Sequence, residues 1–367
     1  MPRAIDQPGN RLPRQSQDSP TPQDKDKKKK RNTLLTALAI TLVIAIVAGV
    51  GYYLIYFMPF QRVIIKVGND AVRIDYFLKR VLNNPNGQDI WSTMETVTYE
   101  LIIKQEAPSY GIDITDADID KALRDAAQGT NESITDAEFN EWYRQQLNYS
   151  TYSKQQFREV VKRSLEMRAL GQVLSDRVPN TAEQGHLWSI IVSTYDEAVA
   201  VKKRADNGED FKILAKELSI DTSTKDKGGE MGWVPFDVLD SPFSSIVYGL
   251  DIGVCSDPVM VSQPDPSSTD PNTQNPPYVV FMVSEKDVAR EVTADQLQIL
   301  KGKALKDWLN NEMNTKTIEF HGLHGTGGYD SETEAWLSYQ LQRMTKAISG
   351  STSTSTSTST TQGQATP

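Results

Sequence analysis

The sequence is poor in the side chains that most often carry redox and metal chemistry. It contains one cysteine, Cys255, and three histidines among 367 residues. A single thiol excludes an intrachain disulfide, so the fold must be stabilised by packing. We therefore expect Cys255 to be a small buried residue rather than a nucleophile.

The few histidines also limit metal chemistry. His321 and His324 stand three positions apart, a spacing that places two ligands on one helix face. Glycines flank both residues, which disfavours a helix, and the sequence offers no evident third ligand. We therefore predict no metal site. The sequence also contains no nucleotide-binding loop and no Ser-His-Asp set, so we predict no cofactor.

Positive charge is scarce outside the first part of the chain. The net charge is −9, yet residues 1–32 hold nine Lys or Arg against four Asp, and the remainder holds 30 against 44 acidic residues. An acidic main part disfavours nucleic acid as a ligand. A nucleic-acid arm is the weaker explanation of the basic run KDKKKKR at 25–31, because an apolar run follows at once.

That apolar run, 33–58, contains no charged residue. A bilayer core of ~30 Å needs about 20 apolar residues in a helix, so we predict a single-pass transmembrane helix in the cell membrane. Positive charge stays on the cytoplasmic side, which places the N-terminus inside and residues 60–367 outside the cytoplasm. A cleaved signal peptide is the alternative, but the run is long and lacks an A-x-A site.

Composition and periodicity divide the chain into parts with different properties. Pro, Ser and Thr-rich ends are expected to stay disordered. A polar stretch, 262–277, reads as a solvated loop insertion. The predicted parts are a disordered basic cytoplasmic tail at 1–32, a transmembrane signal-anchor helix at 33–58, a mostly helical module at 60–182, an α+β domain at 183–287, C-terminal helices at 288–350 and a disordered Ser/Thr tail at 351–367.

Three helix starts are signalled in the helical module. Thr115, Thr135 and Ser153 each stand three residues before a carboxylate or amide, in ITDADIDKAL, ITDAEFNEW and YSKQQF. This spacing lets each hydroxyl cap a free N–H while its partner reaches back. Six later apolar positions recur at helical spacing and are predicted to be core: Phe157, Val160, Val161, Leu165, Met167 and Leu170.

The period changes after residue 179. LWSIIV at 187–192 and VVFMV at 279–283 read as strands, and the order β-α-α-β-α-β with mostly short strands indicates a compact α+β domain. Between them lies KDKGGEMGWVPF, where three glycines fall within five residues. Glycine tolerates backbone angles that a Cβ forbids, so we predict a tight turn or a close approach of another backbone. The helix that begins near residue 293 is expected to pack back on the helical module.

The order of NGEDFKILAKELSID, GGEMGW and SPF followed by GL and PV resembles the parvulin-type (PpiC) peptidyl-prolyl isomerase domain. The resemblance spans 183–287 and implies a four-stranded antiparallel sheet surrounded by helices. The flanking helices resemble, more weakly, those of foldases of the SurA and PrsA kind. The matching residues are Gly208, Phe211, Leu214, Ala215, Ser219, Asp221, Gly228, Gly229, Gly232, Trp233, Phe243, Gly253, Pro258 and Val259.

The resemblance also implies a site. Met231, Leu239 and Phe243 occupy the positions that form an apolar socket for the substrate proline, and Asp221 matches the polar position beside the rotating carbonyl. Members of the family usually carry two histidines on neighbouring strands. Here Ser189 and Val279 stand in their places. Because Val cannot form a hydrogen bond, the paired network is absent.

Three functions remain open at this point. The first is a membrane-anchored, extracytoplasmic prolyl isomerase that acts on X-Pro bonds of unfolded exported proteins. The second is a catalytically weak or inactive parvulin that serves as a peptide-binding holdase. The third is a scaffold of an envelope complex. Isomerase activity itself stays uncertain, because both family histidines are replaced.

Overall fold

The computed structural model describes residues 22–356 apart from 85, 86, 88, 265–269, 271–273 and 324–327, and only the backbone of 22–32 and 349–356. Helices dominate the chain, and two separate sheets lie among them. The elements in chain order are α1 (Pro22–Tyr56), α2 (Met58–Gln61), β1 (Val63–Val67), β2 (Asp70–Arg73), α3 (Ile74–Leu82), α4 (Ile90–Glu106), the 3-10 helix η1 (Ala107–Tyr110), α5 (Asp116–Gln128), α6 (Asp136–Ser150), α7 (Lys154–Asp176), β3 (Thr181–Val192), α8 (Tyr195–Asp206), α9 (Phe211–Leu218), η2 (Lys225–Lys227), β4 (Glu230–Pro235), η3 (Phe236–Val238), α10 (Phe243–Gly249), β5 (Val259–Met260), β6 (Tyr278–Glu291), α12 (Ala294–Thr315), β7 (Ile318–Phe320) and α13 (Ser331–Thr356).

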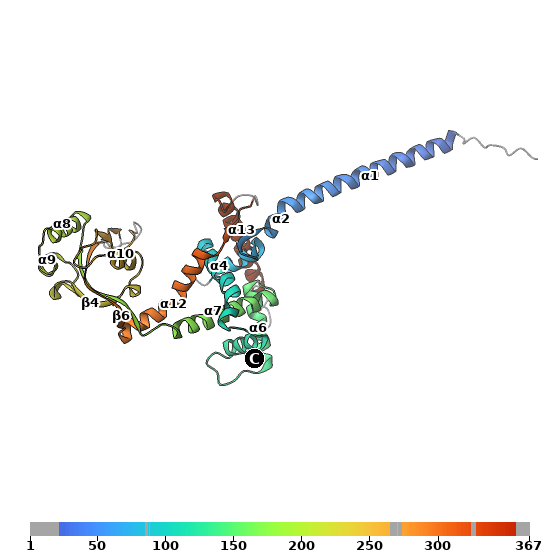
Figure 1. Ribbon diagram of the computed structural model, residues 1–367. Coiled ribbons are helices and arrows are strands. Elements are labelled where there is room, and N and C mark those ends of the chain that lie inside the picture. The colour runs from blue at the N-terminus through green and yellow to red at the C-terminus, as the bar shows by residue number, and fades with distance from the viewer. Residues whose placement is uncertain are drawn as a thin grey trace, which may run out of the picture.

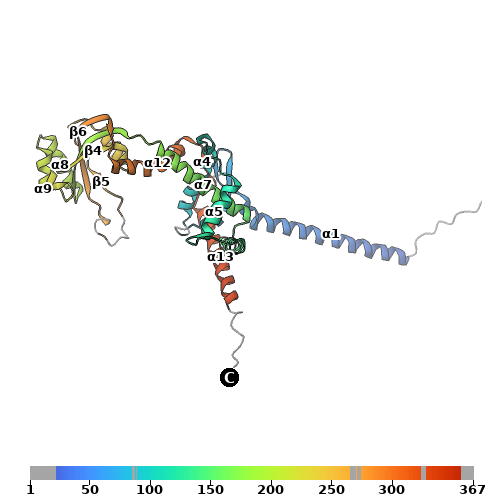
Figure 2. The ribbon, with the colours of Figure 1, turned by 90° about the horizontal axis from the view of Figure 1, so that it is seen from below.

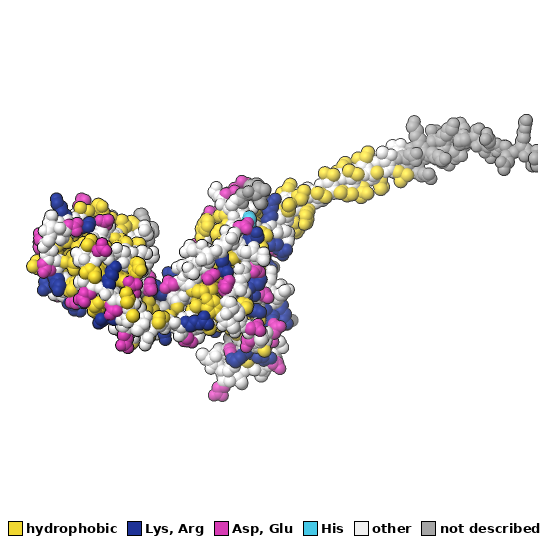
Figure 3. Space-filling model, viewed as in Figure 1, with side chains coloured by type: hydrophobic (Ala, Val, Ile, Leu, Met, Phe, Trp, Pro, Cys, Tyr) yellow, Lys and Arg dark blue, Asp and Glu magenta, His cyan; other side chains and the backbone are white. Residues whose placement is uncertain are grey.

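The first helix projects from the folded part as a single rod (Figure 1). Its stretch Thr33–Tyr56 has a mean hydropathy of 2.6 and buries none of its surface in the protein. Figure 3 shows this stretch almost wholly covered by hydrophobic side chains. A helix of this length and composition is long enough to cross a bilayer.

Helix α1 begins earlier than the sequence suggested. It includes 22–32, which belongs to the tail predicted to be disordered. Lys and Arg are good helix formers and no proline follows Pro22 until Pro59, so the helix extends backwards from the apolar run. The rest of that tail, 1–21, lies outside the described residues. At the other end α13 takes in 351–356, and 357–367 again lies outside them.

One hydrophobic cluster joins residues 58–176 and 294–348 into what we call the helical body. Its sheet has the order β2-β1-β7, with Ile65 opposite Phe320. Leu170 of α7, Leu309 of α12 and Leu337 of α13 are buried in the same cluster. The prediction that the helix after residue 293 packs back on the helical module is therefore confirmed. Strands β2 and β7 were not predicted.

The three predicted helix starts are confirmed. Thr115, Thr135 and Ser153 each form a reciprocal capping box with the residue three positions later. Two further capping boxes, at Thr194 and Thr293, begin α8 and α12.

The predicted core positions of α7 divide into two groups. Leu170 is fully buried and Met167 packs against the cluster of the helical body. The other four line a cavity instead: Phe157, Val160, Val161 and Leu165.

The second sheet is four-stranded and antiparallel, in the order β4-β3-β6-β5. Figures 1 and 2 show α8 and α9 on one side of its strands, and Figure 1 shows α10 on the other. We call Thr181–Glu291 the parvulin-like domain. The expected α+β class with a four-stranded antiparallel sheet is confirmed.

The strands of this sheet differ from their predicted extent. The two central ones, β3 and β6, have 12 and 14 residues and are not short. Polar residues at their outer ends form the same backbone pairs as the apolar ones, for example Gln184 with Asp287. Strand β5 has two residues and pairs with β6 at the edge of the sheet. Strand β6 continues beyond residue 287, the predicted end of the α+β domain. Part of the predicted loop insertion, 262–277, lies outside the described residues. The predicted domain boundaries therefore stay a prediction.

Candidate functional site

The sheet of the parvulin-like domain separates two hydrophobic clusters. Trp188, Ile190 and Val192 of β3 face α8 and α9. Leu187 and Ile191 face the opposite way, toward η3 and α10. Side chains alternate along a strand, so this second face, which we call the socket face, also receives Ser189.

Leu239 and Phe243, two of the three predicted socket residues, both lie on the socket face. Both are half-buried and pack against the same cluster. The ring of Phe243 meets the ring of Phe281 edge to face, with 5.7 Å between centroids. Such pairs add about 0.5–1.5 kcal/mol beyond the area that they bury. The site thus has a fixed aromatic wall.

A side chain from the helical body ties down the loop that carries Leu239. Lys303 of α12 donates hydrogen bonds to the carbonyl oxygens of Asp237, at 2.7 Å, and Leu239, at 2.9 Å. It also forms an ion pair with Asp240 at 3.4 Å. Sequence patterns do not predict this contact, because Lys303 lies more than 60 residues away along the chain.

Met231, the third socket residue, lies on the edge strand β4. Leu187 pairs with Gly232 whereas Trp188 pairs with Glu230, so Met231 is the extra residue of a β-bulge. It exposes 37% of its surface. Gly232 has a φ of +80°, which supplies the backbone turn at the bulge. Bulges re-aim side chains, and here the bulge leaves Met231 accessible to a ligand at the sheet edge.

The paired glycines before Met231 allow the close approach that the sequence predicted. Gly229 has a φ of +85°, and a Cβ at this position would collide with the carbonyl oxygen of Ser189. The Gly229 carbonyl in turn accepts a hydrogen bond of 2.8 Å from the Ser189 amide. A residue with a side chain would therefore push β4 away from β3.

Asp221 lies in the turn after α9 and is held by local donors. Its carboxylate accepts hydrogen bonds from the Ser223 amide at 3.0 Å, the Ser223 hydroxyl at 2.7 Å and the Thr224 hydroxyl at 2.5 Å. Partial burial acts to raise the pKa of Asp221, but the bonds from Thr224 and Ser223 outweigh it and lower that pKa. The carboxylate is ionised at neutral pH and has a fixed position.

The segment that carries Asp221 is anchored to the end of β3. Ile220 donates its amide to the Ile191 carbonyl at 2.7 Å, and the Ser219 hydroxyl accepts from the Ile191 amide at 3.2 Å. Because Ile191 and Ser189 belong to the same strand, this anchoring places the Asp221 turn next to the strand that carries Ser189.

The two positions that the family usually fills with histidine are dry and packed. Ser189 is 4% exposed and Val279 is 3% exposed. They lie on neighbouring strands, where Ser189 pairs with Phe281 and Val279 with Ile191. The strands β3 and β6 therefore present no imidazole to the socket face.

His186 lies on the other face, as its spacing from Ser189 predicts. Its Nδ1 is 3.0 Å from the Ser284 hydroxyl and its Nε2 is 3.1 Å from a Glu230 carboxylate oxygen. Its ring also meets the rings of Trp188 and Trp233. His186 thus belongs to a polar and aromatic cluster that the sheet separates from Leu239 and Phe243.

The remaining chemistry-bearing residues do not extend the site. Cys255 is buried, as predicted, and burial raises the pKa of its thiol to about 11. Among the described residues, no group of three or more His, Cys, Asp or Glu side chains could hold a metal ion. His324 lies outside those residues.

The arrangement suits a rotation about a bond better than bond cleavage. An X-Pro amide rotates over a barrier of ~18–20 kcal/mol, and lowering it requires no nucleophile. It requires an apolar surface that holds the proline ring and surroundings that favour the twisted amide. Leu239 and Phe243 are the candidates for this surface, and the ionised Asp221 is the candidate for the fixed polar group. Sequence reasoning missed Phe281 as part of the wall. Phe281 stands two residues after Val279 in VVFMV, so the alternation of side chains along a strand places both on the same face and could have identified it.

Known proteins resemble this chain in the same region. Residues 190–264 match the family model of the PPIC-type PPIASE domain, Rotamase. Foldase protein PrsA of Clostridium tetani is 36% identical over 127 residues, which is 35% of this chain and 33% of that protein. Foldase protein PrsA 2 of Bacillus anthracis is 27% identical over 161 residues, 44% of this chain and 54% of that protein.

The chain thus spans about a third to a half of the length of these curated relatives. The crystal structure of peptidylprolyl isomerase (PrsA) from Bacillus anthracis aligns with 60% of this chain and 96% of its own, at 24% identity and a TM-score of 0.33. The family model and the curated relatives together show that this chain carries a parvulin-type (PpiC) rotamase domain and is similar to the PrsA foldases.

Proposed function

We propose that this protein is a membrane-anchored, extracytoplasmic foldase whose parvulin-like domain isomerises X-Pro bonds of unfolded exported polypeptides. The observation that carries the proposal is that Leu239 and Phe243 pack on the socket face against the same cluster as Ile191, the residue whose backbone anchors the Asp221 turn. Met231 lies at the bulged edge of the same sheet and completes the proposed socket. No cofactor takes part in this chemistry.

The roles of the residues follow from their surroundings. Leu239 and Phe243 bind the proline ring, and Met231 covers it from the sheet edge. The carbonyl oxygen of an amide carries more negative charge in the planar form than in the twisted form. The ionised Asp221 therefore disfavours the planar form and lowers the barrier to rotation, rather than strengthening binding. Ser189 is a weak substitute for an imidazole because its hydroxyl belongs to a packed sheet face.

The anchor and its orientation are part of the proposal. Helix α1 is long and apolar enough to cross a bilayer, and Lys25 to Arg31 precede its apolar part. Positive residues remain in the cytoplasm, so the parvulin-like domain lies outside. Protease added to intact cells without their wall should digest the helical body and leave a fragment that begins at the N-terminus. Complete protection of the chain would contradict the orientation.

Isomerase activity is tested by exchange spectroscopy on an X-Pro peptide without a coupled protease. We expect the full chain to accelerate cis-trans exchange, and the Asp221→Ala, Phe243→Ala double variant to be at least about tenfold slower. Asp226→Ala, in the exposed part of η2, is the matched control and should keep the wild-type rate. Equal rates for the wild type and the double variant would contradict an enzymatic role.

A holdase is the second candidate, and one observation favours it. The two histidine positions are occupied by Ser189 and Val279, which are buried in an apolar face. In this case the socket binds proline peptides without accelerating exchange, and the protein suppresses aggregation of an unfolded client. The same peptide titration distinguishes the two candidates, because binding without acceleration selects the holdase.

A further inference from the structure

Residues 236–242, which we call the socket loop, connect β4 to α10 and carry Leu239. The parvulin-like domain itself holds the start of this loop. The ring of Phe236 packs against Gly185 of β3, where an added Cβ would lie 2.8 Å from the ring, and the Leu239 amide donates to the Phe236 carbonyl at 3.2 Å. The far part of the loop, 240–242, is exposed. The position of Leu239 therefore depends on what holds the middle of the loop from outside.

Helix α12 supplies that contact through Lys303. Its ammonium donates to the carbonyl oxygens of Asp237 and Leu239 and forms an ion pair with the Asp240 carboxylate. An ammonium has three donors and no acceptor, and these three oxygens account for all of the donors. The Lys303 side chain is only 20% exposed, so water competes weakly for the bonds. The whole polar end of this side chain is thus directed at the middle of the socket loop.

A second side chain of α12 holds the strand that leads into the socket loop. Gln296 donates from Nε2 to the carbonyl oxygen of Trp233 in β4 at 2.8 Å. Its Oε1 accepts from the Thr293 amide in the capping box that begins α12. Gln296 and Lys303 lie two helical turns apart, on the same face of the helix. This face of α12 therefore holds β4 at one point and the socket loop at another.

The same helix is fixed in the helical body by contacts that do not involve the sheet. Trp308 donates from Nε1 to the Tyr110 hydroxyl at 2.8 Å, and Leu309 is buried in the hydrophobic cluster of the helical body. Figures 1 and 2 both show α12 running from the parvulin-like domain to α4 and α7. Lys303 is therefore carried on a helix whose position the helical body sets.

The geometry points to Lys303 as a positioning residue of the proline socket, through which the helical body holds Leu239 in its binding position. The inference rests on the proposed function, which places Leu239 against the proline ring. A loop that is held before the ligand arrives loses less conformational freedom on binding, so the bonds from Lys303 strengthen peptide binding. Leu239 contacts the ring in the planar and the twisted amide alike, so the rate at saturation changes little.

The first test measures the socket loop without a ligand, on the full chain in lipid nanodiscs. Lys303→Met removes the ammonium and keeps a long side chain, so hydrogen exchange of the Leu239 amide should become about tenfold faster while β3 and α4 stay unchanged. Lys303→Arg keeps the charge and the donors and should restore most of the protection. Lys306→Met, at an exposed lysine one turn further along α12, is the matched control and should exchange as the wild type.

The second test titrates the same variants with an X-Pro peptide. Lys303→Met should weaken binding about fivefold and lower the exchange rate at saturation by less than about twofold, because the loop is ordered only when the peptide binds. In a Leu239→Ala background the same substitution should change binding by less than about twofold, since the side chain that Lys303 positions is gone. A lysine that only supports the fold would weaken binding equally in both backgrounds.

Three results would overturn the inference. They are wild-type exchange of the Leu239 amide in Lys303→Met, equal peptide affinity of Lys303→Met and the wild type, and an equal loss of affinity in the wild-type and Leu239→Ala backgrounds. Each of them leaves peptide binding by the wild type intact, and with it the proposed function. A wild type that binds no X-Pro peptide would overturn both proposals, so the two failures are distinguishable.

Discussion

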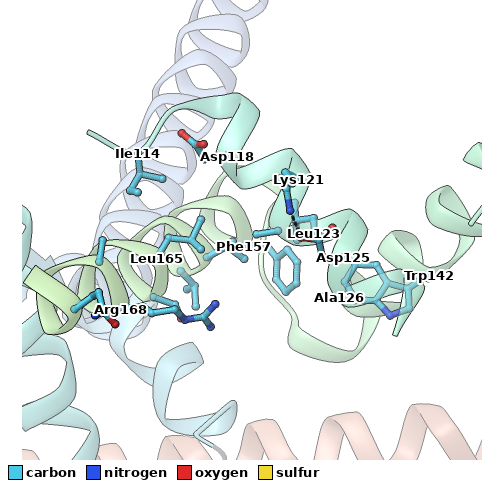
Figure 4. Close-up of a pocket in the computed structure, with 16 residues that line it drawn as sticks. Ile114, Asp118, Lys121, Leu123, Asp125, Ala126, Trp142, Phe157, Leu165 and Arg168 are labelled. Atoms are coloured by element: carbon cyan, nitrogen blue, oxygen red, sulfur yellow. Dashed lines mark hydrogen bonds and ion pairs between the residues drawn. The ribbon is translucent and has the colours of Figure 1, made fainter. Parts of the chain in front are cut away.

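The helical body and the parvulin-like domain use apolar surface in different ways. In the parvulin-like domain both faces of the sheet are covered, and Ser189 and Val279 are buried between strands and helices. In the helical body, Phe157 and Leu165 of α7 line a cavity, while Leu170 one turn further along is fully buried. The first region thus offers a rigid surface that bears a few side chains, whereas the second keeps a mainly apolar cavity between its helices (Figure 4).

The largest expected effect comes from the buried ion pair of the helical body. Arg80 and Glu100 expose only 10% and 11% of their side chains, and a second hydrogen bond joins them at 2.7 Å. Glu100→Ala leaves a buried guanidinium unpaired and should destabilise this region by about 3–5 kcal/mol. Hydrogen exchange should accelerate in α3 and α4 and stay unchanged in β3 and β6.

The exposed pair of Arg144 and Glu141 serves as the control for this change. Glu141→Ala should cost less than about 1 kcal/mol. Equal acceleration in both regions after Glu100→Ala would show that they unfold as one unit, and the comparison would fail.

A glycine tests the packing of the parvulin-like domain. Gly229→Ala forces a side chain into a positive φ and against the Ser189 carbonyl, so we expect a loss of about 2–3 kcal/mol. Faster exchange should appear at β3 and β4 and not in α4. Gly249→Ala is the matched control because no atom lies within 4 Å of the added Cβ. Wild-type exchange in Gly229→Ala would refute the close approach.

The same helix cap occurs in both regions and allows a direct comparison. Thr115→Ala removes the cap of α5, and Thr194→Ala removes the cap of α8. Each should cost about 1 kcal/mol and increase exchange in its own region alone. Thr115→Ser and Thr194→Ser keep the hydroxyl and should restore most of the stability. A loss that appears in the opposite region would contradict independent packing.

The smallest expected effect is a pH dependence at Asp221. Its pKa is lowered in the folded state below the ordinary 3.8, because hydrogen bonds from Thr224 and Ser223 outweigh its partial burial. The ionised form therefore adds stability above that pH, and the contribution disappears as the pH falls through the lowered pKa. Asp221 is largely solvated, so the contribution is under about 1 kcal/mol.

Urea unfolding at neutral pH and at about pH 2.5 measures this term. The wild-type domain should lose more stability on acidification than Asp221→Asn, while Asp226→Asn should behave as the wild type. An identical pH dependence for the wild type and Asp221→Asn would show that the turn does not hold the carboxylate.

Local signals in the sequence predicted local structure well. The capping residues Thr115, Thr135 and Ser153 act within one helical turn, so their spacing suffices to predict three helix starts. The α+β class followed from the change of period after residue 179. By contrast, β7 was missed because its three residues are a strand only through pairing with β1, some 250 residues earlier.

The candidate site was predictable in part, for a similar reason. The resemblance supplied Asp221, Met231, Leu239 and Phe243, and the structure brings Leu239 and Phe243 into one cluster. The cavity was not predictable, because the periodicity that marks Leu170 as core marks Phe157 and Leu165 in the same way. Whether such positions are filled depends on how α5 and α6 pack against α7, which the pattern of one helix does not contain.

The most direct test of the account maps an X-Pro peptide on the isotope-labelled full chain in nanodiscs. The peptide should shift signals of Asp221, Met231, Leu239 and Phe243 and leave the signals of α3 and α4 in place. No shift at Leu239 and Phe243, or equal shifts in α3 and α4, would contradict the account.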